Sequence, residues 1–508
     1  MSSHRLFRLG KWWIVSALLL VPSRLAAWFF VGPQVAPPSR PPLELLASFR
    51  RLGHGSYSGN IRGPLRVSRV NPRYFADPSG HVVYLTGSHT WANLQDTGRT
   101  DPPSAFDYAR FLEFLSRHHH NFFRLWRWEQ SRWTVESVGD FWIEPHPYRR
   151  TGPGSALDGK PKFTLTMFNE NYFNRLRERV IEAERRGFYV AVMLFNGWSI
   201  EKRKGEWHLE NPWHGHPFNA ANNINGINGD SNGNDSGAEV HTLANPSVTA
   251  LQETYVRKVI DTVNDLDNVL YEISNESHAT SWQWQYHMIR YIKEYEAGKP
   301  KQHPVGMTAE WPDGGNGVLF SSPADWISPN SGVENYRDDP QPAQGRKVIL
   351  SDTDHLCGIC GNREWVWKSF LRGLNPVFMD IYDGRSGFEI EQSMRPNRRQ
   401  WVDLRINLGY TLAYAKRLRL QAMIPRGDLA SSGYCLASPS ALDAEYLVFL
   451  PNGANVVVDL SASPGVLKVE WMEVATGNLV RPLSIQGGSK QSLTAPFSGA
   501  AVLYLSAR

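Results

Sequence analysis

Two acidic stretches have the residue types and the setting that an active site requires. Glu276 comes just after the apolar run 269–273, and Asp352 and Asp354 follow the run 347–351. A carboxylate directly after a buried parallel strand lies at the open end of the sheet, where such folds place their chemistry. Two carboxylates facing across a cleft suit glycoside hydrolysis, because one donates a proton while the other attacks the anomeric carbon or activates water. We therefore predict Glu276 as one catalytic acid and Asp352 or Asp354 as the second.

Polar and aromatic residues at the ends of other apolar runs are candidates for binding substrate. Asn275 precedes the first acid, and either Arg124 or Arg127 is expected to hold the second carboxylate ionised. The chain has 19 Trp, and aromatic rings at a pocket mouth suit flat, amphipathic ligands such as sugars, with core packing as the alternative for each ring. The predicted substrate contacts are His89, Trp91, Asn196, Trp198, Glu310, Trp311, His355, Tyr382 and Asp383.

An alternation of strands and helices must position these side chains. Strands are predicted at residues 82–86, 122–126, 189–194, 269–273, 304–308, 326–328, 347–351 and 377–379. Helices are predicted at residues 104–117, 171–186, 247–264, 282–296, 364–371 and 401–420. Eight strands separated by helices or helix-sized connections indicate a (β/α)8 TIM barrel, which we expect over residues 61–428. The segments flanking the turn at residues 77–80 are expected either to plug the base of this barrel or to start its first strand.

The last part of the chain has a different pattern. Four short strands are predicted there, separated by turns such as Pro451-Asn-Gly453, at residues 446–450, 454–460, 466–474 and 500–505. No helical periodicity is present in this region. We therefore predict a small all-β sandwich domain over residues 429–508.

The N-terminus has the features of a targeting segment. Residues 1–27 combine four basic residues with an apolar stretch and end in small residues, which is typical of a signal peptide. Without cleavage, residues 12–32 could anchor the protein in a membrane. A Pro-rich linker follows within residues 28–60. Removal of the first segment takes the formal net charge from +5 to +1, which argues against nucleic acid as a partner. We expect a secreted or periplasmic protein, or a surface-anchored one if the signal stays.

The sequence gives little reason to expect a metal or another cofactor. Its 3 Cys include one C-x2-C pair, Cys357 and Cys360, for which a local disulfide or two idle thiols is the expected state. The Asn/Gly-rich loop 219–235 imitates the start of a calcium loop at Asp230. However, its sixth position is Asp235 and its twelfth is His241, where Gly and Glu are required. We therefore predict neither a metal nor a cofactor.

One family resemblance is carried by the two acidic stretches. Residues 269–276, Val-Leu-Tyr-Glu-Ile-Ser-Asn-Glu, with an acid after the seventh predicted strand, resemble clan A of the glycoside hydrolases, the cellulase-like barrel enzymes. The chain from about residue 61 resembles the apiosidase-like branch of that clan. Segments 447–453 and 469–477 resemble a small β-module that in this branch is labelled collagen-binding.

The resemblance implies retaining hydrolysis of a carbohydrate, with Glu276 as the acid/base and Asn275 holding the sugar 2-hydroxyl or the intermediate. It also agrees with an Arg beside the second acid. One departure matters, because the clan places Glu where this chain has Asp352. The shorter side chain could widen the gap between carboxylates, which is about 5–5.5 Å in retaining enzymes and about 6.5–9.5 Å in inverting ones. The stereochemistry, the sugar and the linkage are left open.

Two other functions fit parts of the sequence. A metal-dependent barrel hydrolase could use His89, Asp352, Asp354 and His355, but the paired His of a metal-binding first strand is absent from the sequence. A carbohydrate- or matrix-binding protein could use the same barrel without catalysis. The presence of acids at both strand ends favours the enzyme.

Overall fold

Eight parallel strands form a barrel that holds the two acidic stretches. The computed structural model describes residues 61–135, 139–201, 210–382, 397–481 and 484–507. In sheet order the barrel strands are β4 (Gly87–His89), β16 (Asn375–Met379), β15 (Val348–Asp352), β14 (Trp326–Ser328), β13 (Val305–Thr308), β12 (Val269–Asn275), β11 (Tyr189–Asn196) and β6 (Phe122–Leu125). All neighbours in this path are parallel. The N–H of Asn121 donates to Thr86 O at 3.0 Å, which brings β6 beside β4 and closes the ring.

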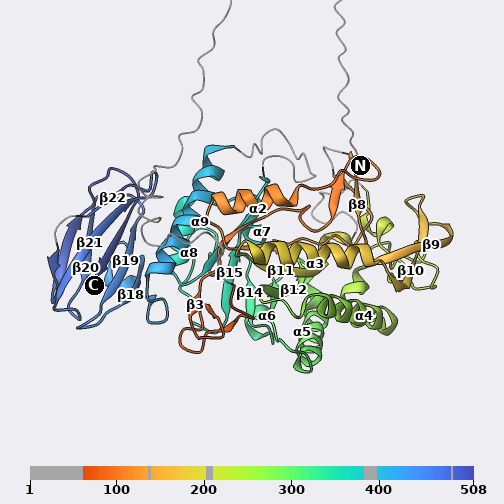
Figure 1. Cartoon of the computed structure of the whole chain (residues 1–508), viewed down its shortest axis with the longest axis horizontal. Coiled ribbons are helices and arrows are strands. Elements are labelled where there is room, and N and C mark those ends of the chain that lie inside the picture. The colour runs from red at the N-terminus through yellow and green to blue at the C-terminus, as the bar shows by residue number, and fades with distance from the viewer. Residues whose placement is uncertain (1–60, 136–138, 202–209, 383–396, 482–483, 508) are drawn as a thin grey trace, which may run out of the picture. The chain divides into compact units, whose positions relative to one another are not determined.

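Helices follow most of the strands and cover the barrel, as Figure 1 shows for α2, α3 and α5. Side chains cap several of their N-termini. Asp107 accepts the N–H of Arg110 at α2, and Asn245 accepts the N–H groups of Ser247 and Val248 at α4. The helices are α2 (Tyr108–Arg117), α3 (Glu170–Arg185), α4 (Pro246–Val263), α5 (Trp282–Ala297), α6 (Asn316–Ser321), α7 (Thr353–Cys357), α8 (Arg363–Leu371) and α9 (Arg399–Arg417).

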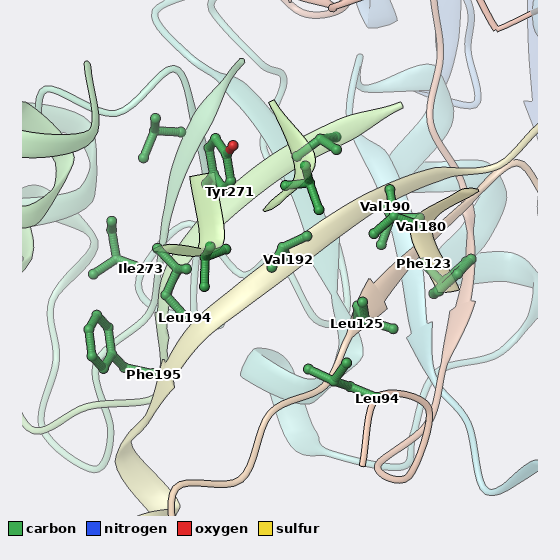
Figure 2. Close-up of a cluster of buried hydrophobic side chains, with 14 of the residues drawn as sticks. Leu94, Phe123, Leu125, Val180, Val190, Val192, Leu194, Phe195, Tyr271 and Ile273 are labelled. Atoms are coloured by element: carbon green, nitrogen blue, oxygen red, sulfur yellow. The ribbon is translucent and has the colours of Figure 1, made fainter. Parts of the chain in front are cut away.

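The barrel strands bury both of their faces. Phe122, Leu270 and Val348 come from strands that are not neighbours yet belong to one hydrophobic cluster, so they lie inside the barrel. Residues of opposite parity, such as Phe123 and Val190, pack in the layer between strands and helices. Figure 2 shows part of this outer layer. Burial of each such side chain contributes about 1.5–3 kcal/mol, which explains why the strands read as unbroken apolar runs.

The first predicted strand is placed too early. Residues 82–86 were expected to begin the barrel, but β3 (Val82–Val83) belongs to a three-stranded antiparallel sheet with β1 (Arg66–Val67) and β2 (Phe75–Ala76). The barrel begins instead at β4. Leu65, Phe75 and Leu85 pack in the same cluster as the inward-facing side chains of the barrel. Of the two alternatives, the hairpin therefore fills the barrel base.

Two small antiparallel sheets, formed by segments between β4 and α3 in the sequence, were not predicted. One is a three-stranded sheet of β5 (Asp96–Gly98), β7 (Arg132–Val135) and β8 (Gly139–Glu144), and the other pairs β9 (Tyr148–Ser155) with β10 (Pro161–Phe168). Short 3-10 turns add to the loops at the strand ends: η1 (Gly197–Ser199), η3 (Pro212–Gly215), η4 (Ala238–His241), η5 (Ala279–Ser281) and η8 (Gly427–Leu429). Of these turns, η4 carries His241, which belongs to the site region described below.

The C-terminal part consists of antiparallel strands. One sheet follows the order β17 (Ile424–Pro425), β18 (Cys435–Ser438), β19 (Glu445–Leu450), β25 (Ala501–Ser506), β21 (Val466–Glu473) and β22 (Leu479–Val480), with β23 (Ile485–Gln486) beside β21. A second pairs β20 (Asn455–Asp459) with β24 (Lys490–Thr494). Side chains of both sheets, among them Val448, Val458 and Leu503, share one hydrophobic cluster. Phe449 and Met472 belong to a different cluster, which also contains Trp367 of α8.

Some expectations fall outside the described residues. The signal at residues 1–27, the anchor at residues 12–32, the linker at residues 28–60 and Asp383 all do so. Within the described ranges, no helix combines the length and the apolar character that a membrane crossing needs. Cys357 and Cys360 are joined by a disulfide, one of the two states expected for this pair.

Candidate active site

Arg124 stands at the centre of a buried cluster of charged and polar groups at the carboxyl ends of the barrel strands. Its Nε and Nη2 donate to the two carboxylate oxygens of Glu272 on β12 at 2.8 and 2.6 Å. Nη1 donates to Asp352 at 3.1 Å and to Asp354 at 2.7 Å, and Nη2 also donates to Asn275 Oδ1 at 2.6 Å. One guanidinium therefore joins the carboxyl ends of β12 and β15, which have β13 and β14 between them in the sheet.

Asp352 is held as a carboxylate. Its Oδ2 lies 2.8 Å from His89 Nε2, and its Oδ1 accepts the N–H of Asp354 at 3.0 Å, which caps the start of α7. Burial by itself raises the pKa of Asp352, but His89 and Arg124 lower it more, so that the net pKa is well below its usual value. An ionised carboxylate at this place has the charge that a nucleophile needs.

Asp354 lies beside this carboxylate, and its pKa is shifted in the opposite direction. Burial and the negative charge of Asp352 raise its pKa above the usual value, although Arg124 acts against this. Two carboxyl groups that share a site are hard to ionise together, so their environments push the two pKa values apart. The pair is therefore best described as an ionised Asp352 next to an Asp354 that retains its proton more readily.

His355 and Asn275 complete the inner part of the cluster. His355 Nε2 lies 3.2 Å from Asn275 Oδ1, and its Nδ1 lies 2.7 Å from the hydroxyl of Ser328 on β14. Burial, together with Arg124, lowers the pKa of His355 well below its usual value, so the ring is neutral. Since an amide oxygen only accepts, Nε2 carries the proton and Nδ1 accepts from Ser328. The amide nitrogen of Asn275 is buried and has no partner among the described residues.

Glu276 follows at the end of β12 with an unusual backbone. Its φ is 47°, in the left-handed region that residues with a side chain seldom adopt. The indole Nε1 of Trp198 donates to Glu276 Oε2 at 2.6 Å. Trp198 also stacks on Trp311, with ring centroids 5.3 Å apart and planes inclined by 18°. Both indoles are half-buried, so they present an aromatic surface next to the acid.

Glu310 contributes a further carboxyl group from the end of β13. Its oxygen accepts the hydroxyl of Ser281 at 3.3 Å. Burial raises the pKa of Glu310 to about 7, and the Ser281 hydroxyl offsets only part of this rise. Glu310 therefore changes its charge close to neutral pH, unlike Asp352.

Two predicted residues, Arg127 and Tyr382, lie away from this cluster. Arg127 was an alternative to Arg124, but its guanidinium packs on the ring of Tyr255 at 4.0 Å and donates to Leu194 O. Arg124 and Arg127 differ by an odd number of positions, so strand alternation points them to opposite faces. Tyr382 was expected to contact substrate, but it packs in the outer layer, 5.0 Å from Phe114.

Two further predicted substrate contacts, Asn196 and Trp91, form hydrogen bonds within the protein. The side chain of Asn196 donates to Arg127 O at 2.9 Å and accepts the N–H of Trp198 at 3.1 Å, so it shapes the turn that carries Trp198. Trp91 is only 4% exposed, and its carbonyl accepts the indole N–H of Trp128 at 3.0 Å. Contact of either side chain with a substrate stays a prediction.

Sequence reasoning missed two acids in this region. Glu272 left a signal, since it is the one charged residue within the apolar run 269–273. Glu129 left none, because its partner His241 is 112 residues away along the chain. His241 Nε2 lies 3.0 Å from Glu129 Oε1, and the pair is buried behind the turn of Glu276.

The calcium-like loop is closed by its own backbone. Asp230 accepts N–H groups of Gly233, Asn234 and Asp235 at 2.9–3.2 Å, so its oxygens already have donors. In the part of the chain that the structure describes, no three or more His, Cys, Asp or Glu side chains form a group suited to hold a metal ion.

Comparison with known proteins supports the fold. A family model described as a domain of unknown function, DUF6298, matches residues 117–313, which is less than half of the chain. That range includes Arg124 and Glu276 but not Asp352. No curated protein matches the sequence.

Two solved structures share the architecture over most of the chain. A glycoside hydrolase family 5 protein from Bacteroides vulgatus has 13% identity and a TM-score of 0.56, with 89% of this chain and 95% of that chain covered. A second structure, named a glycoside hydrolase, has 13% identity and a TM-score of 0.54, with 89% and 98% covered. At this identity the likeness establishes the barrel fold.

Proposed function

We propose that the protein hydrolyses O-glycosidic bonds, with Glu276 as the acid/base and Asp352 as the nucleophile. The observation that carries this proposal is the contact of one guanidinium, that of Arg124, with both Asp352 and Asn275, the neighbour of Glu276. This contact supports a common site for Glu276 and Asp352, because it links the carboxyl end of β12 to that of β15. The two-carboxylate arrangement is the one that glycoside hydrolysis uses, and the solved structures with the same fold are named glycoside hydrolases.

The roles follow from the surroundings of each acid. Asp352 is fixed by His89 and Arg124 and stays ionised, so it would attack the anomeric carbon and form a glycosyl ester. Glu276 would protonate the leaving oxygen and then take a proton from the water that cleaves the ester. This sequence retains the anomeric configuration. Asp354 retains its proton more readily, so it is less suited to attack.

Asn275 and the tryptophan pair would hold the sugar. The buried amide nitrogen of Asn275 needs an acceptor, and a sugar hydroxyl beside the anomeric carbon would supply one. Trp198 and Trp311 would stack against a sugar ring next to Glu276. His89, His355 and Glu310 would complete the binding site from neighbouring strand ends.

Variants of the three acids test this proposal on a panel of plant, microbial and host glycans. Glu276→Gln should lower kcat by about 10²–10⁴-fold, because general acid catalysis is lost. Asp352→Ala should lose activity and regain it with azide, giving a glycosyl azide of inverted configuration. Asp354→Ala is the matched control, and azide should not restore its activity.

Other outcomes would contradict specific parts of the proposal. Full activity in Glu276→Gln would exclude this mechanism. Azide rescue of Asp354→Ala instead of Asp352→Ala would exchange the roles of the two Asp residues. Proton NMR of the first product would show whether configuration is retained. Failure of the wild type on every glycan, with saccharides still bound, would favour a binding protein on the barrel.

The remaining expectations extend this proposal to the whole chain. We place the protein outside the cytoplasm, as a secreted, periplasmic or surface-anchored enzyme, because of the signal-like residues 1–27 and the Cys357–Cys360 disulfide. The C-terminal strands would form a β-sandwich that binds carbohydrate or matrix. Mass spectrometry of the mature N-terminus tests the first of these, and pull-down with insoluble glycans or collagen tests the second.

A further inference from the structure

We propose that Glu129, His241 and Ser277 act together as positioning residues that fix Glu276 for proton transfer. This inference rests on the proposed function, since it assigns a role to groups around its acid/base. The three side chains come from three different loops: the end of β6, the 3-10 turn η4 and the turn after β12. They are 2%, 0% and 0% exposed, and their side chains form hydrogen bonds with one another.

The three residues form a continuous chain of hydrogen bonds. Ser277 Oγ lies 2.9 Å from His241 Nδ1, and His241 Nε2 lies 3.0 Å from Glu129 Oε1. Ser274 extends the chain, with its Oγ 2.6 Å from Ser277 Oγ. Every link is within normal hydrogen-bond length.

The charge states determine which atom donates in each of these hydrogen bonds. Burial lowers the pKa of His241 to about 4, so its ring is neutral at neutral pH. Burial alone would raise the pKa of Glu129, but Arg127 and His241 lower it well below its usual value, so Glu129 is a carboxylate. His241 Nε2–H therefore donates to Glu129, and His241 Nδ1 accepts from the Ser277 hydroxyl.

Glu129 also holds the other side of Glu276. The oxygen that accepts from His241 accepts the N–H of Asn196 at 2.9 Å as well. The side chain of Asn196 in turn accepts the N–H of Trp198, whose indole donates to Glu276. One carboxylate oxygen thus fixes both the turn that carries Glu276 and the turn that carries its hydrogen-bond donor.

The backbone of Glu276 needs such support. Its left-handed φ is followed by Ser277, whose carbonyl accepts the N–H of Trp311 at 3.0 Å. On the other side, a Cβ placed on Gly197 would lie 2.2 Å from the carbonyl oxygen of Glu276. The Ser277 side chain thus connects the buried hydrogen bonds from Glu129 and His241 to a tightly packed turn.

A nucleophilic role for Ser277 does not fit these contacts. A serine, a histidine and an acid in sequence resemble the catalytic set of serine hydrolases. However, the single side-chain oxygen of Ser277 is engaged by both His241 and Ser274. A nucleophile must face the reacting carbon. Positioning is therefore the role that the geometry supports.

Leaving-group dependence separates positioning of an acid from general structural support. The test uses Ser277→Ala, His241→Phe and Glu276→Gln on two glycosides of the sugar that the wild type cleaves, one with an alkyl and one with a 2,4-dinitrophenyl leaving group. The dinitrophenolate leaves without a proton, whereas the alkoxide needs the acid. Phe keeps the stack of residue 241 on Trp284, at 4.6 Å, but forms no hydrogen bonds.

We expect Ser277→Ala to lower kcat/KM for the alkyl glycoside by about 10–100-fold, because a small displacement of a catalytic group has an effect of this size. For the dinitrophenyl glycoside we expect a change of at most about twofold. His241→Gln, which keeps one donor and one acceptor, should recover part of the loss seen in His241→Phe. Ser463→Ala is the matched control, because it removes a similarly buried hydroxyl, bonded to Tyr446 at 2.7 Å, in the loop between β20 and β21.

The outcomes distinguish the two proposals. Suppose that Glu276→Gln loses activity mainly on the alkyl glycoside. Equal losses of Ser277→Ala on both glycosides, or no loss on either, would then overturn the positioning role and leave the hydrolase proposal intact. No effect of Glu276→Gln would overturn the hydrolase mechanism. A crystal structure of Ser277→Ala decides positioning without activity: a displaced Glu276 supports it, and an unchanged φ and Trp198 contact would overturn it.

Discussion

Arg124 and Glu272 form a two-point ion pair inside the barrel, with nitrogen–oxygen distances of 2.8 and 2.6 Å and both side chains at most 3% exposed. The flat guanidinium also reaches Asp352 and Asp354, which a lysine ammonium cannot reproduce. Arg124→Lys should therefore lower the free energy of unfolding by about 3–5 kcal/mol, as loss of a buried pair does. Urea denaturation measures this.

A surface pair provides the matched control for that experiment. Arg177 makes a two-point contact with Asp265 at 2.7 Å for each bond, but the side chains are 39% and 59% exposed. Arg177→Lys should change the free energy of unfolding by less than about 1 kcal/mol. Equal effects of the two substitutions would show that the buried cluster is not organised by Arg124.

Gly197 is predicted to be intolerant of any side chain. A Cβ there would lie 2.2 Å from Glu276 O and 2.6 Å from Ser277 Cα, both backbone atoms that cannot rotate away. Gly197→Ala should lower the free energy of unfolding by about 1–3 kcal/mol through overpacking and should also reduce kcat. Gly315→Ala is the control, because nothing lies within 4 Å of its added Cβ. Normal kcat in Gly197→Ala would contradict the tight contact.

Trp198 is expected to act on Glu276 through its indole N–H as well as its ring. Trp198→Phe keeps an aromatic surface against Trp311 but removes the donor at 2.6 Å from Glu276. Loss of a hydrogen bond is worth about 0.5–1.5 kcal/mol, which corresponds to about a two- to tenfold fall in kcat. Trp311→Phe should mainly raise KM. A change confined to KM in both variants would argue against the hydrogen bond.

Glu310 should make stability depend on pH. Because its pKa in the folded protein is raised to about 7, folding favours the protonated carboxyl. This stabilisation is complete below the unfolded pKa of about 4.3 and is lost as the pH rises through about 7. The melting temperature of Glu310→Gln should therefore fall less than that of the wild type between these pH values. Glu294→Gln, at an exposed position of α5, should behave like the wild type.

Much of the barrel could be predicted because its strands are buried on both faces. Such strands read as apolar runs, and the predicted runs 189–194 and 269–273 coincide with the first residues of β11 and β12. The predicted first strand failed because residues 82–86 are as apolar as a barrel strand, while β4 itself is Gly-Ser-His. The hairpin β9–β10 was missed because its first strand, YRRTGPGS, lacks the alternation of apolar and polar residues that is typical of a strand.

The site was predictable where it depends on strand ends and not where it depends on loops. Glu276 and Asp352 follow apolar runs, so their places at the ends of β12 and β15 could be predicted from the pattern. The choice between Arg124 and Arg127 depends on strand parity, which also follows from the sequence once Phe122 is placed inside the barrel. His241 could not have been found, because the long connection after β11 gives no local signal for its position beside Glu129.

The left-handed backbone of Glu276 has a consequence for how this protein would respond to selection. A non-glycine residue in this region of φ opposes folding, and glycine or asparagine would fit it with less strain. A library selected only for survival at high temperature should therefore replace Glu276, whereas a library selected for turnover should keep it. Comparison of the two enriched populations at this one position would separate what the chain needs in order to fold from what it needs in order to work.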